Sequence, residues 1–95
     1  MPGAIINPGT KIGKNSIINT GAIIDHDCII GDHVHIAPGV TLSGSVKIGT
    51  GSHIGTGASV INGLEIGSRV IVGAGSVVVN TIQDNKKVIG VPARV

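Results

Sequence analysis

The sequence predicts an all-β fold, a parallel β-helix of about four to five triangular coils built from hexapeptide repeats, and three observations predict it. One position in every six residues is aliphatic. The position two residues earlier is mostly small, and a bend-forming pair that often ends in glycine follows the aliphatic residue. A short strand and a bend in each repeat coil the chain into a prism, with three repeats per coil.

The aliphatic position recurs in thirteen consecutive steps of six, at Ile6, Ile12, Ile18, Ile24, Ile30, Ile36, Leu42, Ile48, Ile54, Val60, Ile66, Val72 and Val78. The small position is occupied by Ala4, Thr10, Ser16, Ala22, Cys28, Val34, Val40, Val46, Ser52, Ala58, Leu64, Val70 and Ser76. Side chains alternate along an extended segment, so both positions point to the same side. We therefore expect both to fill the axis of the prism.

The bends predict the corners of the prism. Pro8-Gly9, Pro38-Gly39 and Thr56-Gly57 are typical, because glycine tolerates positive φ and proline fixes φ for a turn. The repeat stops after about Thr81. The predicted organisation is a hexapeptide-repeat β-helix over residues 1–81 and a C-terminal loop and tail over residues 82–95.

Composition excludes several classes of function. The chain has 95 residues and a net charge of +2 with no basic stripe, and it contains no Phe, Tyr or Trp on which bases could stack, so nucleic-acid binding is not expected. No apolar run approaches the roughly 20 residues of a membrane span. One cysteine cannot form an internal disulfide, and the N-terminus lacks a signal-peptide pattern. These features favour a cytoplasmic protein.

The repeat register separates the four polar residues Asp25-His26-Asp27-Cys28. Cys28 falls on the inward position, which disfavours a nucleophilic thiol. His26 and Asp27 fall on a bend and point outward, as a polar turn or as a base with its supporting acid. His35 and His53 are three repeats apart and share one outward column, which is either a solvent-exposed face or one wall of a binding groove.

The run NTGAIIDHDCIIGDHVHIAPGVTLSG and the closing GVPAR resemble the hexapeptide-repeat acyltransferases. This family has a left-handed parallel β-helix that trimerises. Within it, the run is similar to the sugar-modifying branch of sialic-acid O-acetyltransferases and UDP-amino-sugar N-acetyltransferases. Members of this branch usually carry an N-terminal α/β domain that holds the nucleotide sugar, and we expect this chain to lack it.

The resemblance implies an acetyl-CoA-dependent acetyltransferase that acts on an amine or hydroxyl of a sugar or nucleotide sugar. It implies that His26 is the general base and that Asp27 supports it, with Asp25 as a second candidate acid. By position, the family contacts to acetyl-CoA fall on His35, Gly44, Thr56 and Ala74, and an acceptor-side contact falls on Asn19. His33 receives no role.

The placement of the histidines predicts the assembly. His26 lies at a corner, whereas His35 lies in the middle of a different face, and one side of the prism is about 13 Å long. Two histidines so placed cannot converge on one small substrate within a chain. Two neighbouring chains can bring them together, so we expect the sites to lie between the subunits of the homotrimer that the resemblance implies.

Three rival interpretations remain. A zinc site like that of the trimeric β-helix carbonic anhydrases needs two histidines at a spacing of five, whereas the spacings here are 7, 2 and 18, so we expect no metal. An ice-binding face needs stacked threonines, which this chain lacks. The third is a catalytically incomplete trimeric scaffold or an excised domain.

Overall fold

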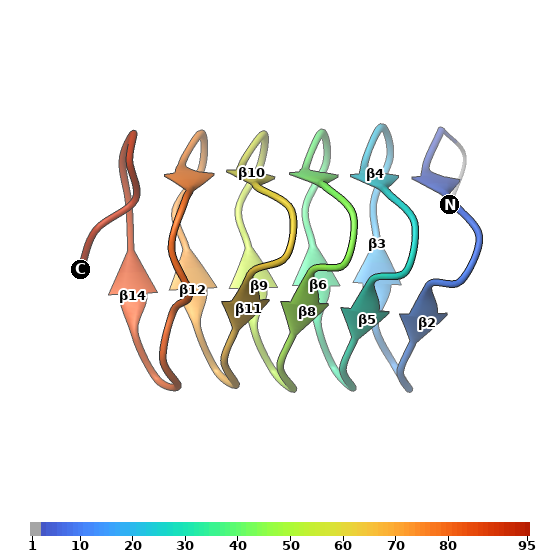
Figure 1. Cartoon of the computed structure of the whole chain (residues 1–95), viewed down its shortest axis with the longest axis horizontal. Coiled ribbons are helices and arrows are strands. Elements are labelled where there is room, and N and C mark those ends of the chain that lie inside the picture. The colour runs from blue at the N-terminus through green and yellow to red at the C-terminus, as the bar shows by residue number, and fades with distance from the viewer. Residues whose placement is uncertain (1–2) are drawn as a thin grey trace.

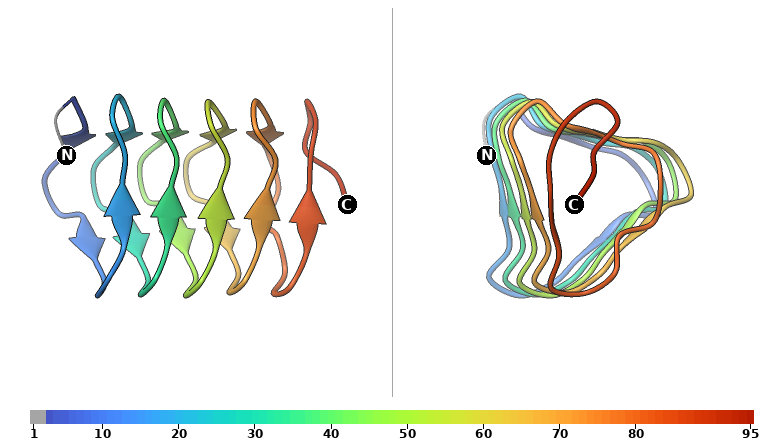
Figure 2. Two further views of the ribbon diagram at one scale, coloured as in Figure 1. Left: turned by 180° about the vertical axis from the view of Figure 1, so that it is seen from behind. Right: turned by 90° about the vertical axis from the view of Figure 1, so that its left-hand side faces the viewer.

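A computed structural model describes residues 3–95 as a triangular prism of parallel β-strands (Figure 1). The described part measures 31 × 21 × 20 Å and contains fourteen strands of two residues each and no helix, so no helical segment in it could cross a membrane. Viewed end on, the coils superpose as a triangle, with one sheet along each side (Figure 2). The predicted all-β, left-handed parallel β-helix of four to five coils is confirmed.

Each of the first four coils contributes one strand to each of three sheets, and the last coil contributes a strand to two of them. Sheet A contains, in spatial order, β1 (Ile5–Ile6), β4 (Ile23–Ile24), β7 (Thr41–Leu42), β10 (Ser59–Val60) and β13 (Val77–Val78). Sheet B contains β2 (Lys11–Ile12), β5 (Ile29–Ile30), β8 (Lys47–Ile48) and β11 (Glu65–Ile66). Sheet C contains β3 (Ile17–Ile18), β6 (His35–Ile36), β9 (His53–Ile54), β12 (Ile71–Val72) and β14 (Lys87–Val88).

The sheets stack in a register of three full repeats over most of the chain. Ile23 pairs with Thr41, and His35 pairs with His53. This register follows from the uninterrupted six-residue repeat, because three repeats return the chain to the same side of the prism. Residues one coil apart therefore form straight columns along the outer surface.

The axis of the prism is filled as the sequence predicts. From Ile18 to Val78 every aliphatic position of the repeat is buried, and the small positions from Ala22 to Val46 pack beside them. Ile6 and Ile12 remain 47% and 39% exposed, because they belong to the first coil and a coil stacks on only one side of it. Each buried Ile or Val contributes about 1.5–3 kcal/mol relative to an exposed one.

The three edges of the prism are columns of four-residue corners. We call them the AB edge, the BC edge and the CA edge after the sheets that they join. The AB edge contains corners 7–10, 25–28, 43–46 and 61–64; the BC edge contains 13–16, 31–34, 49–52, 67–70 and 83–86; the CA edge contains 19–22, 37–40, 55–58 and 73–76. The third residue of each of these corners has positive φ.

Residues 82–95, expected to be only a loop and a tail, continue the sheets. Ile82 bridges Ile66 and β14 pairs with β12, but in both pairs the offset is shorter than three full repeats. Only four positions separate Val78 from Ile82, so one corner is two residues short, and the six-residue step then resumes from Ile82 to Val88. A fixed six-residue count does not find these strands, because the shorter corner moves Ile82 and Val88 out of the earlier register. The domain boundary near residue 81 stays a prediction.

Candidate functional site

The corner after β4 presents an imidazole and a carboxylate to solvent. His26 Nδ1 lies 3.2 Å from Asp27 Oδ2, and the two side chains are 61% and 66% exposed. An ionised carboxylate only accepts hydrogen bonds, so this contact places a proton on Nδ1. The neutral ring then has its Nε2 lone pair free to accept a proton, which is the state that a general base requires.

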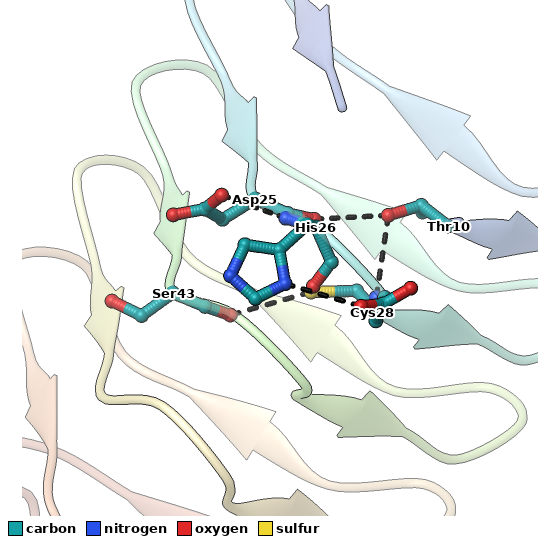
Figure 3. Close-up of polar contacts among 6 residues, drawn as sticks. Thr10, Asp25, His26, Cys28 and Ser43 are labelled. Atoms are coloured by element: carbon teal, nitrogen blue, oxygen red, sulfur yellow. Dashed lines mark hydrogen bonds and ion pairs between the residues drawn. The ribbon is translucent and has the colours of Figure 1, made fainter. Parts of the chain in front are cut away.

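Backbone contacts fix the position of this pair. Asp25 Oδ1 accepts a hydrogen bond of 2.7 Å from the His26 N–H (Figure 3). The Asp27 N–H donates to Pro8 O at 3.1 Å, and His26 O accepts from the Ser45 N–H at 3.0 Å. The corner is thereby tied to the coil before it and to the coil after it. Asp25 acts here on the backbone of the corner, and Asp27 is the acid that contacts the imidazole.

Gly44 lies against the imidazole in the next coil of the AB edge. A Cβ atom at this position would lie 2.8 Å from both Cε1 and Nε2 of His26. Glycine therefore leaves the space that the ring occupies. The ring and Gly44 border an open depression of about 570 Å³ that is also lined by Asp25, Ser43, Ser45, Asn62 and Gly63. Ser43 and Ser45 were not singled out from the sequence, although they stand one coil after Asp25 and Asp27 in the same columns.

Cys28 points into the core, as its register predicts, and is fully buried. Burial raises the pKa of its thiol, and the charges of Asp25 and Asp27 act in the same direction, while the N–H groups of Val46 and Ser45 oppose them. Its Sγ–H donates to Ser43 O at 3.3 Å. A buried, protonated thiol is unsuited to nucleophilic attack.

A second polar group lies on sheet C and the adjoining CA edge. Asn19 Nδ2–H donates to His35 Nε2 at 2.8 Å and to Ile36 O at 3.1 Å. The His35 and His53 rings are edge to face with their centroids 4.6 Å apart. Partial burial lowers the pKa of His53, and the neighbouring His35 lowers it further.

The predicted site residues fall into two groups. His26, Asp27 and Gly44 meet on the AB edge, whereas Asn19 and His35 meet at sheet C. Thr56 and Ala74 are exposed in successive corners of the CA edge. In a triangle each edge is opposite one side, and sheet C is the side opposite the AB edge (Figure 2). A single chain does not bring the two groups together.

The side chains offer no cluster suited to a metal. Among residues 3–95, no three His, Cys, Asp or Glu side chains gather closely enough to hold an ion. His26 and His35 belong to different groups, and Cys28 is buried in the core. The chemistry available at the AB edge is therefore proton transfer and hydrogen bonding by an exposed imidazole, two carboxylates and backbone groups.

Comparison with known proteins gives a family match over part of the chain. Residues 9–44 match the bacterial transferase hexapeptide family model of six repeats. No match was found among curated protein sequences. The matched segment contains Asp25-His26-Asp27, so the resemblance inferred from the sequence is confirmed over the residues that carry the corner.

Several solved structures share the fold over nearly the whole chain. A His-to-Asn mutant of perosamine N-acetyltransferase from Caulobacter crescentus, in complex with CoA and GDP-perosamine, is 47% identical over 97% of this chain with a TM-score of 0.96. The acetyltransferase domain of PglB from Neisseria gonorrhoeae FA1090, in complex with acetyl coenzyme A, is 40% identical over 97% with a TM-score of 0.82. Serine acetyltransferase from Neisseria gonorrhoeae, in complex with serine, is 34% identical over 94% with a TM-score of 0.87. The present chain spans 44%, 51% and 41% of these three chains.

Proposed function

We propose that this chain is an acetyl-CoA-dependent acetyltransferase acting on an amine or hydroxyl of a sugar or nucleotide sugar. Its residues 9–44 match the bacterial transferase hexapeptide repeats. The observation that carries the proposal is the exposed His26–Asp27 pair, in which Nδ1 lies 3.2 Å from the carboxylate and the His26 side chain is 61% exposed. Acetyl-CoA is a co-substrate, and the proposed reaction uses no metal.

The similar proteins support both substrates of the proposal. One similar structure contains CoA together with GDP-perosamine, and another contains acetyl coenzyme A. Both are more than a third identical to this chain over almost its full length. We carry the acetyl donor and the sugar class of acceptor over to this chain as parts of the proposal.

In the proposed mechanism the acetyl group moves directly from CoA to the acceptor. His26 Nε2 removes the proton from the attacking amine or hydroxyl as the new bond to the thioester carbonyl forms. Asp27 holds the ring in its Nδ1–H tautomer and stabilises the imidazolium. The imidazolium then returns its proton to the departing CoA sulfur as the C–S bond breaks, so no acyl-enzyme forms.

The remaining predicted contacts stay proposals. Acetyl-CoA would contact His35, Gly44, Thr56 and Ala74, and the acceptor would contact Asn19. These residues are divided between the AB edge and the opposite side of the prism, so a complete site needs two chains. We propose a C₃ homotrimer with its sites between subunits, in the cytoplasm where acetyl-CoA is available.

A catalytically incomplete scaffold is the second candidate function. The observation that favours it is the regularity of the repeat, since the strands from β1 to β13 follow one another without an inserted loop and the stacking of the coils needs no catalytic residue. In this case the trimer and acetyl-CoA binding would persist without turnover. Velocity sedimentation together with an activity assay separates the two candidates.

The test of the enzyme proposal is release of CoA thiol from acetyl-CoA, with a panel of amino sugars and nucleotide-linked amino sugars as acceptors. His26→Asn should lower kcat at least roughly 100-fold and leave the Kd of CoA, measured by calorimetry, within about twofold. His33→Asn is the matched control, because His33 also occupies an exposed corner. Full activity in His26→Asn, or an acetylated Cys28 detected by mass spectrometry, would overturn the mechanism.

A further inference from the structure

Hydroxyl groups from one coil bridge particular corners of the next coil. Thr10 Oγ1–H donates to Asp25 O at 2.9 Å, and Thr10 Oγ1 accepts from the Cys28 N–H at 3.3 Å (Figure 3). The hydroxyl thus joins the first carbonyl and the last N–H of corner 25–28. The same bridge recurs on the BC edge, where Ser16 joins Gly31 O and Val34 N, and Ser52 joins Gly67 O and Val70 N.

Five of the corners with glycine as their third residue close differently. In corner 37–40 the Val40 N–H donates directly to Ala37 O at 3.4 Å, with Gly39 at φ 73°. Four further glycine corners, 19–22, 49–52, 55–58 and 73–76, have the same direct bond. This is the hydrogen bond of a type II turn, whose third residue has a φ of about +80°.

The bridged corners carry a side chain where the directly closed corners carry glycine. Asp27, His33 and Arg69 have φ values of 58°, 56° and 54°, whereas the glycines of the directly closed corners have φ between 70° and 77°. A residue with a Cβ atom prefers the left-handed region at a φ of about +57°. Within residues 3–95, no direct hydrogen bond joins the first carbonyl and the last N–H of any of these three corners. The hydroxyl of Thr10, Ser16 or Ser52 lies between the two groups and bonds to both.

The residue 17 positions before the third residue of a corner differs between the bridged corners and the directly closed corners. Thr10, Ser16 and Ser52 precede Asp27, His33 and Arg69, and Cys28 precedes Ser45 with its thiol on Ser43 O. The directly closed glycine corners are preceded instead by alanine or valine: Ala4, Ala22, Val34, Val40 and Ala58. A hydroxyl or thiol therefore accompanies each of these side-chain-bearing corners, because an opened turn leaves inward-facing polar groups that need a partner.

We propose that Thr10 is a positioning residue for the acetyl-transfer site: its hydroxyl holds corner 25–28 open, and so fixes the direction in which His26 and Asp27 point. This inference rests on the proposed function for its catalytic readout. Thr10 does not contact the imidazole, so it acts only through Asp25 O and the Cys28 N–H. Its partner groups flank the catalytic pair directly in the chain.

The repeat provides a matched control. Ser52 makes the same bridge at corner 67–70 on the BC edge, to which the proposed mechanism assigns no role. Valine occupies the register of Thr10 at Val34, Val40, Val46 and Val70, so the fold accommodates Thr10→Val. Thr10→Ala is a second variant, and Thr10→Ser is the conservative rescue because serine makes this bridge twice in the same chain.

The test compares Thr10→Val, Thr10→Ser and Ser52→Ala in the thiol-release assay. Thr10→Val should lower kcat about tenfold, with the KM for acetyl-CoA within about twofold, because a misdirected base affects the chemical step more than donor binding. Thr10→Ser should restore kcat to within about twofold of wild type, and Ser52→Ala should lower thermal stability without lowering kcat. An unchanged kcat in Thr10→Val, or an equal loss in Ser52→Ala, would overturn the proposal.

An NMR readout keeps this inference separate from the function itself. Thr10→Val should speed hydrogen exchange of the Cys28 amide and shift the His26 ring resonances, while Ser52→Ala should leave both unchanged. If the wild-type protein transfers no acetyl group, the proposed function fails and the NMR result alone decides whether Thr10 directs His26. Unmoved His26 resonances in Thr10→Val would then refute the positioning role.

Discussion

Corners 25–28 and 37–40 occupy the same place in the repeat, but different hydrogen bonds stabilise the two turns. Corner 37–40 uses Pro38-Gly39 and closes with its own hydrogen bond. Corner 25–28 has Asp27 at φ 58° and depends on Thr10 from the preceding coil. A non-glycine residue with positive φ carries a conformational cost of about 1–2 kcal/mol, so corner 25–28 has the less favourable backbone of the two. The same corner exposes the His26 and Asp27 side chains. The comparison teaches that a corner with a side chain at the positive-φ position can depend on a hydroxyl from the preceding coil, and that the proposed catalytic pair lies at such a corner.

The largest expected effect concerns the carboxylate that distinguishes the two corners. Asp27→Asn should lower kcat roughly 10- to 100-fold, because a neutral amide does not stabilise the imidazolium. Asparagine tolerates positive φ, as Asn15 and Asn85 do at equivalent corners, so the thermal midpoint should stay near that of wild type. Thiol-release kinetics and circular dichroism measure the two quantities. A kcat in Asp27→Asn equal to that of wild type would mean that Asp27 serves only the turn and does not assist the imidazole.

The next effect tests the space beside the imidazole. Gly44→Ala should lower kcat about tenfold, because the new Cβ would lie 2.8 Å from His26 Nε2 and force the ring to move. Asn62→Ala, one coil further along the AB edge, is the matched control and should stay within about twofold of wild type. The same loss in both variants would show that the depression is sensitive to any change and that Gly44 has no specific effect on the ring.

Two opposite substitutions measure how much a side chain at the positive-φ position changes the free energy of unfolding. Asp27→Gly should raise the free energy of unfolding by about 0.5–1 kcal/mol, and Gly57→Ala should lower it by about 1 kcal/mol. Gly57 has φ 71° and its Cβ position is open, so only the backbone contributes. Urea unfolding at one fixed protein concentration measures both changes. A destabilised Asp27→Gly protein would mean that contacts of Asp27 outweigh its backbone strain.

The smallest effect concerns pH and the second group of residues. Burial and His35 lower the pKa of His53 below its ordinary 6.5, so the folded chain binds this proton less readily than the unfolded chain. The stability linked to His53 is therefore complete above pH 6.5 and is lost as the pH falls from there towards the folded-state pKa. His53→Asn should reduce the fall in thermal midpoint between neutral and mildly acidic pH. Equal slopes in wild type and His53→Asn would contradict this assignment.

The fold was predictable because the repeat is long and regular. Thirteen aliphatic residues in one register leave few alternatives to a three-sided coil, and the burial of Ile18 to Val78 follows directly. The segment after Thr81 was harder, since two missing residues hide Ile82 and Val88 from a fixed six-residue count. The inward position of Cys28 and the outward position of His26 also followed from register alone.

The contacts of the site were less predictable. The sequence indicated His26 and Asp27 as a pair, but not that Gly44 packs against the ring or that Asn19 binds His35. Those contacts join residues on neighbouring coils, and they depend on rotamers and on the exact stacking of those coils. The repeat register alone assigns Thr10 only a small inward position. A hydroxyl 17 positions before the third residue of each bridged corner is nevertheless a signal present in the sequence.

The sequence by itself determined the three-sided parallel helix, its straight outer columns and which side chains face the axis, because side-chain alternation and a six-residue period are local rules. Only the tertiary structure decided which turns close by themselves and which need a hydroxyl from the neighbouring coil. That choice depends on backbone angles that differ between the two kinds of corner, 58° at Asp27 and 73° at Gly39, and on atoms supplied by another coil. It also decided that Gly44 packs against the His26 ring and that Asn19 donates to His35, since these contacts depend on rotamers and on how neighbouring coils stack.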